Sequence, residues 1–187
     1  MNIAIYCGSS FGKGDDYKIH AQNVVKYLKQ KNDSIVYGGS ESGIMGVVSN
    51  EAIALDMNVI GVITNRLATL EKENTKLKDI IKVETIRERK QVMLEKSDAF
   101  LVLPGGLGTF DEIFEVLTLI QIGEINKPCA FLNVNGYYDK LKEFLYSCVD
   151  QGFIEGRFID MITFDSDIAK IHEKFTNYKE VRAKWDK

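Results

Sequence analysis

The sequence predicts an α/β protein with a doubly wound, mostly parallel sheet that carries helices on both faces. Apolar strand-like runs alternate with helical patterns along the whole chain. Runs such as "AFLVL" at 99–103 are continuously apolar, which indicates strands buried on both faces. The 187 residues contain no internal repeat or linker, so a single domain over 1–187 is expected.

The first half of the chain supplies three predicted strands and two helices. The segment 43–56 has apolar residues at helical spacing, and the preceding helix turns Val24, Val25 and Leu28 inward. Residues 64–79 are polar without a clean period and are expected to form a mobile loop that could include a helical turn. The expected elements are strand 2–6, helix 15–31, strand 34–39, helix 43–56 and strand 58–63.

The second half continues the alternation with four more predicted strands. The pattern ends in a charged helix from about Asp165. The expected elements are strand 80–84, helix 86–97, strand 99–104, helix 109–123, strand 128–134, helix 137–152 and strand 161–164.

Composition excludes several classes of function. The formal net charge of -3 disfavours a general nucleic-acid binder, and no apolar run is long enough to span a bilayer. The start "MNIAIYCGSS" lacks a secretory leader, so a cytoplasmic protein is expected. The three cysteines lack metal-ligand spacing and are expected to be free thiols. His20 and His172 are expected on the surface, so neither a Ser–His–Asp triad, a metal site nor a cofactor is predicted.

Three glycine-bearing loops follow predicted strands: "CGSS" with Ser9, "YGGSESGIMG" with Gly39, and "PGGLGT" at 104–109. Ligands of a doubly wound sheet bind beyond the carboxyl ends of its strands, where these loops would meet. Bare backbone amides at a helix start favour an anion, so a phosphate-bearing ligand is predicted. The alternative is that short strand-to-helix turns simply require glycine. Neither a G-x-G-x-x-G fingerprint nor a triphosphate-binding lysine is present.

Two groups of charged residues stand near the third loop. Thr109 and Glu112 form T-x-x-E, which is either a capping box or a carboxylate that faces a ligand's sugar. The cluster "RERK" at 87–90 is either a solvated helix face or a set of cations opposite an anion.

These motifs resemble those of the Lonely Guy (LOG) family, the cytokinin riboside 5′-monophosphate phosphoribohydrolases. "PGGLGTFDE" is similar to the family's P-G-G-x-G-T-x-x-E motif, and "RERK" is similar to its x-x-R-K element at the matching distance. "NVNGYYDKL" and "VDQGFI" extend the likeness through 2–165. The resemblance implies a Rossmann-like homodimer that cleaves AMP, or an N6-substituted AMP, to free base and ribose 5-phosphate. The apolar character of helix 109–123 on several faces agrees with a dimer, or with full burial in one subunit.

The resemblance also assigns roles to residues. Arg89 and Glu112 take the catalytic positions, and Asp111 is a guess for the acid that protonates the leaving base. The predicted substrate-binding residues are Ser9, Gly39, Glu71, Lys90, Gly105, Gly106, Leu107, Gly108, Thr109, Phe110, Asp111 and Thr118.

The chain departs from the family pattern at two positions, which leaves the preferred base open. Arg87 stands where a histidine is common, and Glu41 adds a negative charge to the second glycine loop. A non-catalytic protein that binds a nucleotide or a phosphorylated cofactor is the main alternative, and another phosphoribosyl hydrolase or transferase is a third. The family's frequent label "lysine decarboxylase" is rejected, because the sequence offers no recognisable pyridoxal-phosphate lysine site.

Overall fold

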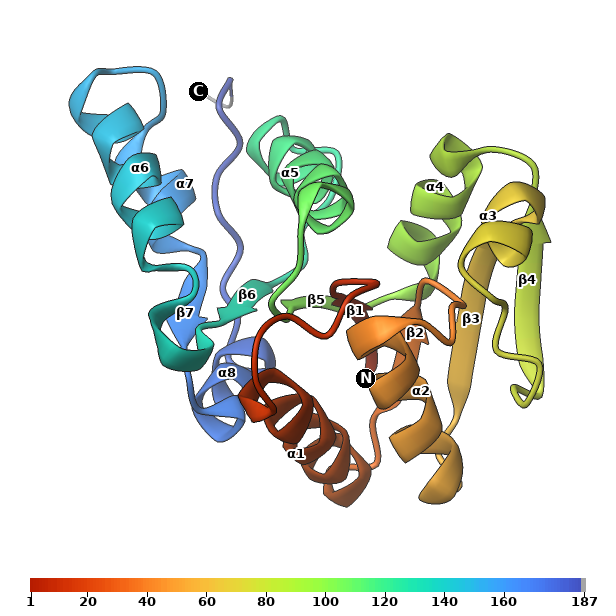
Figure 1. Cartoon of the computed structure of the whole chain (residues 1–187). Helices are drawn as coiled ribbons and strands as arrows, with labels where there is room; N and C mark the ends of the chain where they lie inside the picture. Colours follow the sequence, from red (N-terminus) through yellow and green to blue (C-terminus); the bar gives the residue numbers. More distant parts are fainter. Residues whose placement is uncertain (186–187) are drawn as a thin grey trace.

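All seven strands of the computed structural model, which describes residues 1–185, lie in one sheet of order β4-β3-β2-β1-β5-β6-β7 (Figure 1). Every neighbouring pair is parallel, which confirms the predicted fold class. The strands are β1 (Asn2–Tyr6), β2 (Ser34–Tyr37), β3 (Val59–Thr64), β4 (Asp79–Val83), β5 (Ala99–Val102), β6 (Cys129–Leu132) and β7 (Thr163–Asp165). The chain builds outward from β1 to β4 and then crosses to β5, so the order reverses beside β1.

Helices cover both faces of the sheet. One face packs against α1, α2 and α8, and the other against α4, α5, α6 and α7 (Figure 1). The helices are α1 (Asp16–Gln30), α2 (Gly43–Ala54), α3 (Asn65–Leu70), α4 (Ile86–Lys96), α5 (Leu107–Gln121), α6 (Asp139–Asp150), α7 (Gly156–Asp160) and α8 (Ile168–Thr176), with a 3₁₀ turn η1 (Val134–Gly136) before α6. Within residues 1–185 no helix is long and apolar enough to cross a membrane.

The apolar strands are buried on both sides, as their continuous hydrophobicity predicts. In β5, Leu101 belongs to the core under α1 and α2, whereas Phe100 and Val102 belong to the core under α4 and α5. All three side chains have no exposed surface. Successive strand residues point to opposite faces, so a strand between two helix layers needs apolar residues at every position.

The segment 64–79 differs most from its expected form. It contains a defined helix, α3, whose first turn is capped because Thr64 Oγ1 accepts a hydrogen bond from the Leu67 amide at 3.1 Å. No side chain of α3 is buried, so the helix has no apolar stripe that a sequence pattern could show. The five-residue α7 was also not predicted.

One histidine is less exposed than expected. His172 of α8 retains 12% side-chain exposure, and its Nε2 lies 2.8 Å from a carboxylate oxygen of the buried Asp33. The prediction of a surface position was therefore wrong for His172, although the contact lies far from the glycine loops. All three cysteines are free, as expected.

Gly43, the first residue of α2, provides a test of how closely α2 packs against the loop that follows β1. Gly43 has φ of 55°, and a Cβ added there would lie 2.3 Å from the backbone of Ser9 and Ser10. We expect Gly43→Ala to lower the free energy of unfolding by about 2 to 4 kcal/mol, because it combines backbone strain with overpacking. Urea denaturation measures the loss. Gly156→Ala is the matched control, because its Cβ would find only ordinary contacts, the nearest at 3.7 Å. Equal stabilities for both variants would contradict the prediction.

Candidate active site

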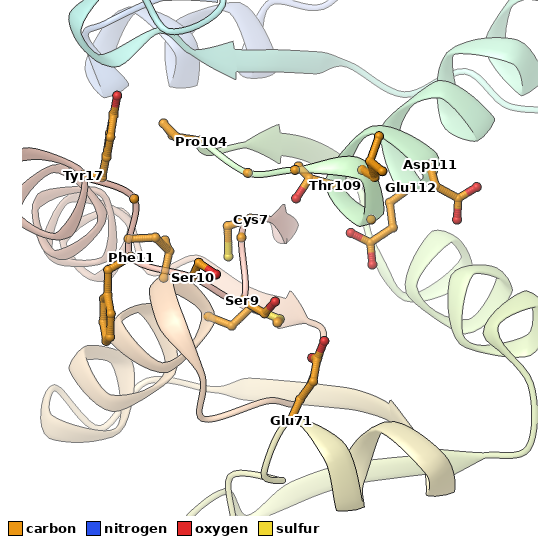
Figure 2. A pocket seen from close by; sticks show the side chains of 18 of the residues that line it. Cys7, Ser9, Ser10, Phe11, Tyr17, Glu71, Pro104, Thr109, Asp111 and Glu112 are labelled. Carbon is orange, nitrogen blue, oxygen red and sulfur yellow. The ribbon is translucent and has the colours of Figure 1, made fainter.

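A pocket of about 530 Å³ lies at the carboxyl edge of the sheet, where the strand order reverses between β1 and β5 (Figure 2). The three glycine loops meet there, as the sequence predicts. The Gly8 amide donates to the Pro104 carbonyl at 3.1 Å, and the Ile44 amide donates to the Gly8 carbonyl at 3.0 Å. The pocket is lined by Cys7, Gly8, Ser9, Ser10, Phe11, Gly12, Tyr17, Ile44, Met45, Leu67, Glu71, Ile86, Arg89, Pro104, Gly105, Gly106, Leu107, Gly108, Thr109, Asp111, Glu112 and Tyr137.

The third loop presents the amino terminus of α5 to this pocket. Gly106 is the N-cap residue, and no side chain caps this end of the helix within the described chain. A Cβ added at Gly106 or Gly108 would meet nothing within 4 Å. The first amides of a helix have no intrahelical acceptor and carry the positive end of its dipole. The loop can therefore receive an anion such as a phosphate.

Gly105 has a different role in the same loop. A Cβ at this position would lie 2.1 Å from Thr109 Oγ1 and 2.9 Å from the Gly8 amide nitrogen. The missing side chain thus allows the buried Thr109 and the loop after β1 to pack against the backbone.

Arg89 and Glu112 form a buried ion pair at the inner wall of the pocket. Arg89 Nη1 donates to Glu112 Oε1 at 2.7 Å, and Arg89 Nε donates to the Val62 carbonyl at 2.9 Å. Arg89 is 7% exposed and Glu112 is 8% exposed. The guanidinium fits because Gly38 lacks a side chain, since a Cβ there would lie 2.0 Å from Arg89 Nη2. At least one glycine of the second loop therefore makes room for a protein side chain rather than for a ligand.

The electrostatics of Glu112 are set by two opposing effects. Burial raises the pKa of Glu112 above its ordinary value, and the neighbouring Arg89 guanidinium counteracts that rise. Burial is the larger of the two effects, so the pKa of Glu112 stays above its ordinary value despite the guanidinium.

The capping-box interpretation of Thr109 and Glu112 is wrong. The helix begins at Leu107, so Thr109 is its third residue and Glu112 lies a turn further in, where its carboxylate bonds Arg89. A capping box does exist in α4, where the Thr85 side chain and the Glu88 side chain bond each other's backbone amides. Two cations of "RERK", Arg89 and Lys90, pair with acids of α5, whereas Arg87 is exposed.

Some of the remaining predicted residues line the pocket, and others lie outside it. Ser9, Glu71 and Asp111 line the pocket with the glycine loop, but Asp111 Oδ1 accepts a hydrogen bond from Lys90 at 3.1 Å and its carboxylate points away from Glu112 (Figure 2). Lys90 also pairs with Glu115.

Four predicted residues lie outside the pocket lining: Gly39, Lys90, Phe110 and Thr118. Phe110 and Thr118 face a shallow groove on the outer side of α5, together with Leu107 and Phe114. The Gly39 carbonyl accepts a hydrogen bond from the Asn74 amide at 3.0 Å.

Sequence reasoning missed the aromatic wall of the pocket. Tyr17 and Tyr137 pack edge to face, with ring centroids 5.7 Å apart, and the Tyr137 hydroxyl donates to the Gly105 carbonyl at 2.7 Å. Tyr137 follows β6, the strand next to β5, so the same rule about strand ends could have found it.

Among residues 1–185, no cluster of three or more histidine, cysteine or acidic side chains could hold a metal ion. Burial raises the pKa of the Cys7 thiol at the base of the pocket, so this thiol stays protonated.

The fold and the pocket define a doubly wound α/β protein with an uncapped helix terminus beside a buried carboxylate. Residues 45–175 match the family model described as "Possible lysine decarboxylase". The chain is 40% identical over 152 residues to cytokinin riboside 5′-monophosphate phosphoribohydrolase LOG2 of Arabidopsis thaliana, which covers 81% of this chain and 71% of that protein. It is 36% identical over 176 residues to LOG3 of the same plant, with 94% and 82% covered. The chain belongs to the LOG family, as its motifs predict.

Solved structures with the same fold are more distant in sequence. The X-ray structure of TM1055 has a TM-score of 0.72 at 20% identity and covers 94% of this chain and 98% of that one. The molybdenum cofactor binding protein of Rippkaea orientalis has a TM-score of 0.69 at 16% identity, with 94% and 95% covered. At these identities the likeness concerns the fold alone.

Removal of Arg89 from the Arg89–Glu112 pair is expected to lower the free energy of unfolding by an amount that depends on pH. The raised pKa of Glu112 means that its contribution to stability is complete below its ordinary value of 4.5 and is lost as pH rises through the raised pKa. Arg89→Met raises that pKa further and leaves a buried charge without its partner. We expect a small change in unfolding free energy at pH 4 and a loss of about 3 to 5 kcal/mol at pH 8, measured by urea denaturation.

Lys90→Met is the control, because Lys90 pairs with the more exposed Asp111 and Glu115. It should cost about 1 kcal/mol or less at both pH values. An Arg89→Met loss of the same size at pH 4 and pH 8 would show that the charge of Glu112 is not its cause.

Proposed function

We propose that the protein hydrolyses the N-glycosidic bond of a nucleoside 5′-monophosphate, AMP or an N6-substituted AMP, to free base and ribose 5-phosphate. The observation that carries the proposal is the position of Glu112, which lies buried in the pocket beside an uncapped helix terminus suited to phosphate. Membership of a family whose relatives bear the name of this activity supports it. A cytoplasmic location is part of the same proposal.

The phosphate would bind the amides at the start of α5, with the Thr109 hydroxyl beside them. This contact fixes the ribose and spends binding energy on orientation, so a nucleoside without phosphate should react poorly. The substrate-binding roles of Ser9, Glu71 and the residues 105–109 belong to the proposal.

Glycosidic cleavage passes through an oxocarbenium-like sugar. The ionised Glu112 would stabilise the positive charge at C1′ and accept the proton of the attacking water. The C1′–N bond breaks with its electron pair on the base, which takes up a proton from solvent, and the water oxygen forms the new bond to C1′ as its own proton passes to Glu112. Two nitrogens of Arg89 bond Glu112 and the Val62 carbonyl, so Arg89 would orient Glu112 and favour its ionised form rather than bind phosphate as its main task.

The leaving base needs a proton, and the geometry does not favour Asp111 as its donor. The Asp111 side chain is 57% exposed and is bonded to Lys90. Glu71 faces the pocket from the wall opposite Glu112 (Figure 2).

The proposal includes a homodimer through the outer face of α5. Leu107 is 87% exposed and Phe114 is 37% exposed on this face, and a groove of about 530 Å³ runs between them and Leu119. Large apolar side chains gathered on one helix face are typical of a protein interface.

Substitution of the central carboxylate tests the hydrolase. Glu112→Gln keeps the size of the side chain but removes its charge, so kcat for adenine release from AMP should fall about 10²- to 10⁴-fold. Chromatography of the free base measures the rate. Glu115→Gln, on the same helix, is the matched control and should remain near wild type.

A folded Glu112→Gln protein with wild-type turnover would remove Glu112 from the mechanism. Binding of nucleoside monophosphates without release of any base would instead identify a non-catalytic nucleotide-binding protein.

The dimer has its own test. Phe114→Glu places a charge on the outer face of α5 and should convert the protein to a monomer, measured by size-exclusion chromatography with light scattering. Phe144→Glu on α6, at a side chain that is 64% exposed, is the control and should keep the mass of the wild type. A monomeric wild type, or an unchanged mass for Phe114→Glu, would refute this interface.

A further inference from the structure

Glu71 lies in the pocket without support from the core. It follows α3 directly, and no residue of that helix is buried. Its carboxylate nevertheless faces the same space as Glu112 (Figure 2). Something other than apolar packing must therefore fix the backbone of Glu71.

The loop between β2 and α2 supplies that support through hydrogen bonds. The Ser40 hydroxyl donates to the Glu71 carbonyl at 2.8 Å, and the Ser42 hydroxyl donates to the same carbonyl oxygen. The Glu41 amide donates to the Lys72 carbonyl at 2.8 Å. We call the contacts of 40–42 with 71–72 the clasp. Since the last carbonyls of a helix lack intrahelical donors, the clasp satisfies groups that α3 leaves free.

The clasp uses a serine that would ordinarily serve its own helix. Ser42 is the N-cap residue of α2, but its side chain makes no capping hydrogen bond and instead bonds Glu71. The Ser42 amide donates to Ser40 Oγ at 3.0 Å, which joins the two hydroxyls into one network. Ser40 has no exposed surface, so its hydrogen bonds are shielded from water.

The loop that carries the clasp is itself hydrogen-bonded to the loop that follows β1. The amides of Ile44 and Met45 both donate to the Gly8 carbonyl, at 3.0 and 3.3 Å. A displacement of 40–42 would therefore disturb the loop that carries Ser9. The Gly8 amide in turn donates to the Pro104 carbonyl at 3.1 Å, so a chain of hydrogen bonds runs from the clasp to the proposed phosphate loop.

The side chain of Glu41 takes no part in this arrangement. Its carboxylate pairs with Lys76 Nζ at 3.2 Å, and both side chains are at least one-third exposed. The negative charge that the sequence places near the phosphate loop is thus directed to a lysine on the neighbouring segment.

We propose that Ser40 and Ser42 are positioning residues of the active site, which hold Glu71 so that its carboxylate accepts a hydrogen bond from the nucleoside half of the substrate. A carboxylate recognises hydroxyl and amino donors, which the ribose and an adenine-type base both carry. This inference rests on the proposed function. It adds that the polar residues of the second glycine loop control substrate affinity without touching the substrate.

A double-mutant cycle tests the inference. Ser40→Ala/Ser42→Ala should raise KM for AMP about 5- to 30-fold while kcat changes little, because hydrogen bonds that position a binding group are lost. In a Glu71→Ala background the same serine substitutions should have almost no further effect. Ser40→Ala/Ser42→Thr, which restores one hydroxyl, should recover part of the affinity. Lys76→Met, which contacts only the Glu41 carboxylate among the clasp residues, should leave KM unchanged.

Three results would overturn the inference. The first is an unchanged KM in the double alanine variant, and the second is an equal loss of AMP affinity with and without the Glu71 side chain. The third is a loss of AMP affinity accompanied by weaker inhibition by inorganic phosphate, which would indicate a general disturbance of the pocket. The cycle is also measured as the dissociation constant of AMP by calorimetry. A wild type that binds AMP without releasing adenine therefore refutes the hydrolase while the positioning effect is still read from affinity.

Discussion

The buried ion pair between Arg89 and Glu112 is the interaction on which the site depends. It joins α4 to α5, the helices that precede and follow β5 in the chain. Arg89 also donates a hydrogen bond to the Val62 carbonyl in β3. A buried charge without a partner is costly, so each member of the pair constrains the position of the other. The Arg89 guanidinium thereby counteracts the rise in the pKa of Glu112 that burial causes.

Some glycines near the pocket leave space for protein side chains rather than for a ligand. Gly38 leaves the space that the Arg89 guanidinium occupies, and Gly105 leaves the space for Thr109. Among the glycines that line the pocket, only Gly106 and Gly108 face open space. The glycine-rich loops of this LOG protein therefore combine two functions. Gly38 and Gly105 allow close packing of Arg89 and Thr109, and Gly106 and Gly108 leave bare backbone toward the pocket.

The sequence predicted those parts of the structure that depend on periodic burial. All seven strands and the meeting of the glycine loops follow from apolar runs and from the rule about strand ends. For α3 the sequence predicts no more than an optional helical turn within a loop, because none of its residues is fully buried and its end is held by polar contacts to residues distant in sequence. The partner of Glu112 was ambiguous for a similar reason. Spacing alone allows a local cap at Thr109 as well as a role toward a ligand, whereas the fold brings Arg89 from a different helix.

The two outermost strands have a consequence for how copies of the chain can associate. β4 carries the charged residues Asp79 and Lys82, and β7 is only three residues long. Charged or very short border strands are poor templates for main-chain pairing with another polypeptide. The sheet therefore offers little for strand addition at either end, which favours helical surfaces for self-association.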